Sequence, residues 1–133
     1  MTTVPPLKVG TITRTTLALF AGASGDHNPI HIDIDSARAS GMDDVFAHGM
    51  LSMAYLGRAL TDVVPQSRLV ELATRFTAIT PVLAAPVITA EPDGVETGPD
   101  GARLARYALT ATLADGTVTL RGHALLAVPE ADT

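Results

Sequence analysis

The chain of 133 residues contains no cysteine, and only 17% of its residues are charged. Without cysteine there is no disulfide, no thiolate nucleophile and no cysteine-ligated zinc or iron–sulfur centre. The nine lysines and arginines are scattered and are outnumbered by fourteen acidic residues, so the formal net charge is −5. Proteins that bind a phosphate backbone carry a concentrated basic surface, which this composition lacks. We therefore expect no nucleic acid partner.

Long apolar runs are also missing from the sequence. No segment approaches the roughly 20 apolar residues that span a bilayer, and residues 1–10 lack a basic region followed by an apolar stretch. We therefore expect a cytoplasmic protein that does not associate with membranes. The 47% hydrophobic content is sufficient for a substantial core. Because there is no repeat or linker, the length predicts a single domain over residues 1–133.

The predicted helices come first in the chain and the predicted strands follow. Apolar spacing and turn residues predict short helices over 16–23 and 36–40 and a longer helix over 49–63. Apolar residues surround most of the longest helix, so we expect it to be buried. Alternating apolar and polar residues predict strands over 69–79, 85–90, 103–113 and 117–128, with turns at 92–94 and 114–116. This order predicts an α+β domain with an antiparallel sheet and one buried helix.

A polar loop with the sequence Ser-Gly-Asp-His-Asn-Pro-Ile-His follows the first predicted helix, at residues 24–31. Pro29 restricts the backbone, so a rigid turn can direct Asp26 and His31 to one point. A carboxylate and an imidazole beside an apolar cavity can divide the work of moving a proton on and off water, because burial and mutual proximity can tune such pKa values toward neutrality. Asn28 can orient either group by hydrogen bonding. Because these residue types are also common turn formers, a purely structural loop is the alternative.

Metal binding is a second alternative for this region, since the side chains of Asp26, His27, His31, Asp33 and His48 offer oxygen and nitrogen ligands. His27 and His31 are four residues apart, but the intervening proline disfavours the helical geometry of such pairs. The familiar helical motif of two histidines and a glutamate is absent. We therefore predict no metal and no organic cofactor.

The segment Ala47-His48-Gly49-Met50 stands at the start of the longest predicted helix. A helix N-terminus presents unpaired N–H groups and the positive end of the helix dipole. Gly49 has no side chain, so a ligand carbonyl can approach its backbone closely. This arrangement suits a thioester oxygen that becomes an oxyanion. The alternative is an ordinary helix start with a loop glycine.

Together, the run FAGASGDHNPIHIDID at residues 20–35 and the run FAHGML at residues 46–51 resemble the MaoC-like (R)-specific enoyl-CoA hydratase family. This family includes the (3R)-hydroxyacyl-ACP dehydratase subunits. The close match covers residues 16–60, about a third of the chain, and a weaker match lies at residues 75–82. The resemblance implies a hot-dog fold, in which an antiparallel sheet wraps around a long central helix.

The resemblance also implies roles for individual residues. Asp26 and His31 match the catalytic aspartate and histidine of the family, and Asn28 matches the asparagine between them. Gly49 matches the glycine whose backbone N–H polarises the thioester carbonyl. The predicted oxyanion and substrate-binding group consists of Gly49, the preceding His48 and Asn28. The implied reaction adds water across a trans-2-enoyl thioester of CoA or acyl carrier protein to give the (3R)-hydroxyacyl thioester, or reverses that step.

A single small hot-dog unit leaves a sheet edge exposed and its substrate tunnel incompletely enclosed. We therefore expect a homodimer or a heterodimer with another hot-dog subunit. The alternatives are the catalytic subunit of a heterodimeric (3R)-hydroxyacyl-ACP dehydratase, an acyl thioesterase and a non-catalytic acyl-binding subunit. His123 is expected on the polar face of a strand. Four arginines are candidates for contact with a carrier phosphate or for solvated strand-face charges: Arg75, Arg103, Arg106 and Arg121.

Overall fold

The computed structural model describes residues 1–130, which form three α-helices and five β-strands. The helices are α1 (Arg14–Ser24), α2 (Ile34–Ala39) and α3 (Gly49–Thr61). The strands are β1 (Leu7–Lys8), β2 (Leu69–Phe76), β3 (Val87–Thr97), β4 (Arg103–Thr112) and β5 (Val118–Ala127). Short 3₁₀ turns occupy Pro29–His31 and Gln66–Arg68. Within residues 1–130, every helix is too short or too polar to cross a membrane.

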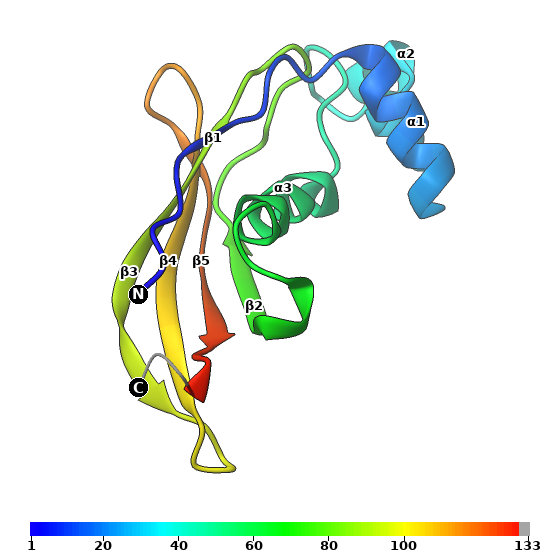
Figure 1. Ribbon diagram of the computed structural model, residues 1–133. Helices are drawn as coiled ribbons and strands as arrows, with labels where there is room; N and C mark the ends of the chain where they lie inside the picture. Colours follow the sequence, from blue (N-terminus) through cyan, green and yellow to red (C-terminus); the bar gives the residue numbers. More distant parts are fainter. Residues whose placement is uncertain (131–133) are drawn as a thin grey trace.

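The five strands form one antiparallel sheet in the order β1-β3-β4-β5-β2. The sheet is curved, and α3 lies against its concave face (Figure 1). Alternate residues of β4 are buried against the helix, as the sequence pattern predicts: Ala105, Tyr107, Leu109 and Ala111. They pack with Leu56 and Leu60 of α3, which are fully buried. The helix is thus held by the larger of two apolar clusters.

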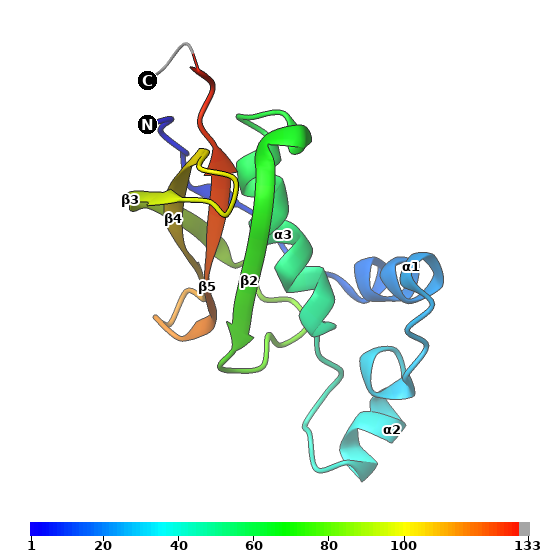
Figure 2. The same cartoon turned by 90° about the horizontal axis from the view of Figure 1, so that it is seen from below.

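The second apolar cluster lies outside the sheet, where α1 and α2 pack beyond the N-terminal end of α3 (Figure 2). Its buried members include Ile12, Leu17 of α1, Ala37 of α2 and Leu51 of α3. An ion pair joins Arg14 in α1 to Asp44, with N···O distances of 2.8 and 2.6 Å. These contacts fix the loop between α1 and α2 beside the start of α3.

The structure corrects three details of the sequence interpretation. Helix α3 is buried on one side only, since Met50 is 58% exposed and Ala54 is also exposed.

The predicted turn at residues 92–94 is instead a bulge inside β3, which continues to Thr97. Strand β1 pairs only with Val87 and Ile88, so β3 lies at the sheet edge near Pro92, where a missing N–H is tolerated. Strand β2 ends at Phe76, three residues earlier than predicted.

Candidate active site

The loop that carries Asp26 and His31 is shaped by its own polar side chains. Helix α1 ends at Ser24, and Gly25 caps it in the left-handed conformation with φ of 78°. The backbone N–H of Asn28 donates to Asp26 Oδ1 at 3.2 Å. The Asn28 side chain accepts from the N–H of Ile30 and so caps the 3₁₀ turn that carries His31. Asn28 therefore positions both candidates through the backbone, and its own side chain is engaged in the turn.

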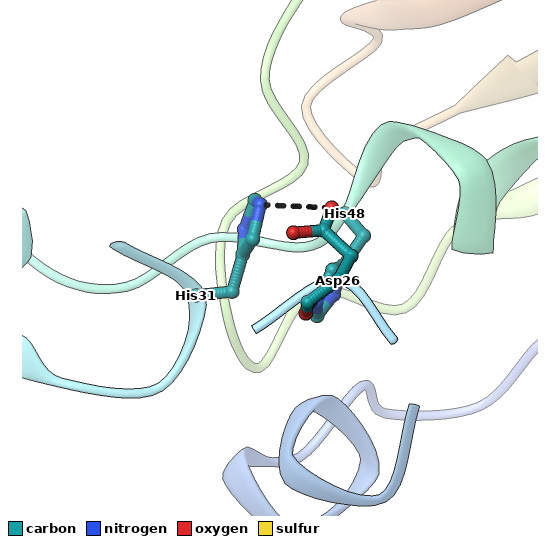
Figure 3. Close-up of side chains that lie close together, drawn as sticks. All are labelled: Asp26, His31 and His48. Carbon is teal, nitrogen blue, oxygen red and sulfur yellow. Dashed lines mark hydrogen bonds and ion pairs between the residues drawn. The ribbon is translucent and has the colours of Figure 1, made fainter. Parts of the chain in front are cut away.

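His31 is buried, and its two ring nitrogens have different surroundings. Nδ1 lies 2.7 Å from the carbonyl oxygen of Phe46. Because a carbonyl only accepts hydrogen bonds, Nδ1 carries a proton and donates it. Nε2 faces the Asp26 carboxylate at 4.0 Å, and the Asp26 side chain is 51% exposed (Figure 3). Nε2 is therefore the ring atom that can exchange a proton with a ligand.

His48 lies beneath this pair and is almost completely buried, with 1% exposure. Its Nε2–H donates to the backbone carbonyl of Asp26 at 3.2 Å. Its ring stacks on His31 with centroids 3.9 Å apart and meets the edge of Phe20 at 4.8 Å. Burial, with a smaller contribution from His31, lowers the pKa of His48, so this ring is neutral near pH 7. His48 thus joins the Asp26 loop, the His31 ring and the start of α3.

Gly49 is the first residue of α3, and His48 at the N-cap makes no side-chain capping bond. The first N–H groups of a helix lack partners within the helix, so the N-terminal end of α3 presents free donors. A Cβ at Gly49 would lie 3.0 Å from the Phe76 ring. Beside Gly49 is a cavity of about 180 Å³, whose lining includes Phe46, Ser52, Phe76, Ile79 and Leu120. The site therefore combines free backbone donors with a small, mostly apolar cavity.

The candidate metal ligands separate into two groups in the structure. The nearest ligand atoms of Asp26, His31 and His48 all lie within 4.8 Å of one another. Ligands of a tetrahedral zinc lie roughly 3.4 Å apart, so this group must contract to hold such an ion. His27 is exposed, and the Asp33 side chain caps α2 by accepting from the Asp35 N–H. These last two residues do not join the cluster.

Four of the remaining polar candidates, His123 and three arginines, lie on the sheet face that points away from α3. Arg103 is separate from them and lines another hollow together with Ala105 and Tyr107. His123 is paired with Glu71 at 2.6 Å, and Arg106 is paired with Asp93 and Glu96. Arg75 and Arg121 are opposite each other on β2 and β5. With His123 and Arg106 they line a shallow hollow of about 460 Å³. The structure does not bring this group to the Asp26–His31 pair.

Two features of the site escaped the sequence analysis. The contribution of Phe46 is its backbone carbonyl, which no side-chain pattern can mark. Ser52 lines the cavity together with Gly49. The available signal for Ser52 was its position three residues after Gly49, on the same face of the helix.

Comparisons with known proteins identify relatives of this chain. The chain is 29% identical over 119 residues to an (R)-specific enoyl-CoA hydratase of Rhodospirillum rubrum, covering 90% of this chain and 81% of that protein. It is 44% identical over 48 residues to 3-hydroxyacyl-thioester dehydratase Z of Mycobacterium tuberculosis, covering 36% of this chain and 32% of that protein.

Solved structures share the fold over nearly the whole chain. An R-hydratase of Pseudomonas aeruginosa superposes with a TM-score of 0.79 at 27% identity, covering 98% of this chain and 83% of that one. The ChsH1–ChsH2 complex of Mycobacterium tuberculosis contains a chain with a TM-score of 0.81 at 22% identity, with coverage of 97% and 100%. The predicted hot-dog fold and the predicted enzyme class, a carbon–oxygen lyase, are thereby confirmed. Because the model of the MaoC like domain matches residues 3–97, the chain belongs to the MaoC-like family.

Proposed function

We propose that this chain catalyses the (R)-specific hydration of trans-2-enoyl thioesters to (3R)-hydroxyacyl thioesters, and the reverse dehydration. The observation that carries the proposal is the position of the Asp26 carboxylate and the His31 Nε2, 4.0 Å apart beside the start of α3. The names of the relatives support the same reaction class. The carrier of the acyl group is CoA or an acyl carrier protein.

The start of α3 is the electrophilic part of the proposed site. A thioester carbonyl oxygen that accepts a hydrogen bond from the Gly49 N–H lies at the positive end of the helix dipole. Polarisation of this carbonyl makes C3 of the enoyl group electrophilic and moves negative charge onto the oxygen. Because the donor is fixed by the helix, it is oriented before the charge develops.

Asp26 and His31 carry out the proton transfers. Their 4.0 Å separation is too long for a direct hydrogen bond but allows one water molecule to contact both groups. The water oxygen attacks C3 while the pair accepts one of its protons, and the pair delivers a proton to C2. Hydration therefore returns the pair to its starting protonation state. The Phe46 carbonyl holds the His31 ring with Nε2 toward the substrate.

The test is the loss of enoyl-thioester absorbance when the protein meets trans-2-enoyl substrates on CoA and on acyl carrier protein. We expect a (3R) product, and we expect Asp26→Asn and His31→Ala to lower kcat by roughly 10²–10⁴-fold. His27→Ala and Asp35→Asn are matched controls, because both side chains are exposed and lie outside the proposed site. Release of free thiol would instead indicate a thioesterase, and a folded protein without turnover on either carrier would contradict the proposal.

A second hot-dog unit completes the proposed enzyme. Strand β2 is an edge of the sheet, and the side chains of Val70 and Phe76 on it are exposed. An exposed strand with apolar side chains is a pairing surface. We expect light scattering to give about twice the chain mass of 13.8 kDa if the partner is a second copy. A protein that is monomeric alone and becomes active only with a different hot-dog subunit indicates the heterodimer.

A further inference from the structure

Ser52 is the fourth residue of α3, and its hydroxyl group has an unusual environment. The residue is only 3% exposed. A serine inside a helix normally directs its hydroxyl to solvent or donates it to the carbonyl four residues earlier. Neither occurs here: within residues 1–130 Ser52 Oγ has no hydrogen-bond partner. The His48 carbonyl accepts only from backbone N–H groups. In contrast, Ser40 Oγ donates to the Ser36 carbonyl at 3.1 Å.

The cavity beside Gly49 is the remaining direction for this hydroxyl. Ser52 and Gly49 both line the cavity, and residues three apart share one face of a helix. Side chains of a helix tilt toward its N-terminus, so the Ser52 hydroxyl is directed back toward the Gly49 backbone. Apolar side chains, including Phe76 and Leu120, surround it. Within residues 1–130, the one fully enclosed side-chain polar atom without a partner is His48 Nδ1, so Ser52 Oγ keeps accessible surface. The hydroxyl is therefore available to a ligand in the cavity that brings a hydrogen-bond acceptor.

We infer that the Ser52 hydroxyl is a second hydrogen-bond donor to the thioester carbonyl oxygen, beside the Gly49 N–H. This inference rests on the proposed hydratase function. Sites that stabilise an oxyanion commonly combine backbone N–H groups with side-chain donors such as serine. An O–H donor bonds more strongly to an oxygen that gains negative charge, so Ser52 stabilises the transition state more than the bound substrate. The hydroxyl keeps its proton throughout, and no covalent intermediate is formed.

The inference separates catalysis from stability. Because the hydroxyl has no partner in the free protein and alanine favours helices, Ser52→Ala should leave Tm unchanged or raise it by roughly 1–3 °C. The same change should lower kcat by about 10²-fold, with KM altered by less than about threefold. A merely structural serine would show the opposite behaviour, with a lower Tm and an unchanged rate.

The control for the loss of a buried hydroxyl is Thr119→Val. Thr119 is fully buried on β5, and its Oγ1 donates to the Ala111 carbonyl at 3.4 Å, away from the cavity. This variant should lower Tm and retain kcat. Thr80→Val removes the hydroxyl of another buried residue that lines the cavity, outside α3. Thr80→Val therefore tests the competing donor in the same cavity: if Ser52 is the donor, the carbonyl band of the bound thioester stays in place in this variant.

The direct readout is the infrared band of a ¹³C-labelled thioester carbonyl in bound butyryl-CoA, which is saturated and is not turned over. We expect this band to move to higher wavenumber in Ser52→Ala, because one donor is lost, and to stay in place in the two threonine variants. If the wild type hydrates enoyl-CoA while Ser52→Ala keeps its rate and its carbonyl band, the role of Ser52 is refuted and the proposed function stands. A shift in Thr80→Val alone would assign the donor to Thr80. A wild type that neither hydrates enoyl-CoA nor binds butyryl-CoA overturns both proposals.

Discussion

Replacement of His48 by phenylalanine tests how the site is held together. Phenylalanine keeps a ring that can stack on His31, at 3.9 Å between centroids, but removes the Nε2–H that donates to the Asp26 carbonyl. Loss of one such hydrogen bond costs about 0.5–1.5 kcal/mol, and the exposed Asp26 loop allows water to replace it. His48→Ala also removes the buried ring and should cost about 3–4 kcal/mol. Urea denaturation measures both values.

His48→Phe also has a predicted effect on activity and on the pH dependence of stability. Burial lowers the pKa of His48 below the ordinary value of 6.5, so the unfolded chain binds this proton more readily than the folded protein. The contribution of neutral His48 to the free energy of unfolding is therefore complete above pH 6.5. It is lost as the pH falls from 6.5 through the lowered pKa of His48 in the folded protein. His48→Phe should remove this dependence and should lower kcat by about 10-fold, because the Asp26 loop is less well positioned. Wild-type kcat together with an unchanged pH dependence would refute the positioning role of His48.

Three further predictions concern the start of α3, the cavity beside it and the Arg14–Asp44 ion pair. Gly49→Ala should lower kcat/KM by at least about 10-fold with little change in Tm, because the new methyl displaces the Phe76 ring, 3.0 Å away, at the N-terminal end of α3. Steady-state kinetics and a thermal melt measure the two effects, and full activity would contradict the prediction. A cavity of about 180 Å³ is slightly larger than the roughly 150 Å³ cavity that holds benzene, so acyl groups of about four to six carbons should give the highest kcat/KM. Phe76→Ala should move that optimum to longer chains, and an unchanged chain-length profile argues against this cavity as the acyl site. Arg14 holds the pKa of Asp44 at about 2, so Arg14→Gln should raise it toward 3.8, as an NMR titration can measure.

The sequence predicts the sheet and the polar loop because both depend on short-range patterns. Alternation along β4 identifies its buried face, and Pro29 and Asn28 shape the turn that carries His31. The position of His48 beneath Asp26 depends on contacts 22 residues apart, which a local pattern does not reveal. The segment at residues 92–94 has turn chemistry, but pairing with β4 makes it a bulge. Tertiary pairing thus decides between two conformations that the same residues allow.

The two apolar clusters divide the site between separately packed parts of the chain. Asp26 and His31 belong to the segment that α1 and α2 hold, while Gly49 and Ser52 belong to the helix that the sheet holds. Leu51 is the α3 residue buried in the smaller cluster. Regions with few buried contacts open at a lower free energy than the whole molecule. Partial unfolding of the α1–α2 segment would therefore separate the acid–base pair from the oxyanion donors while the sheet remains folded, so catalytic competence is a more fragile property of this chain than its fold.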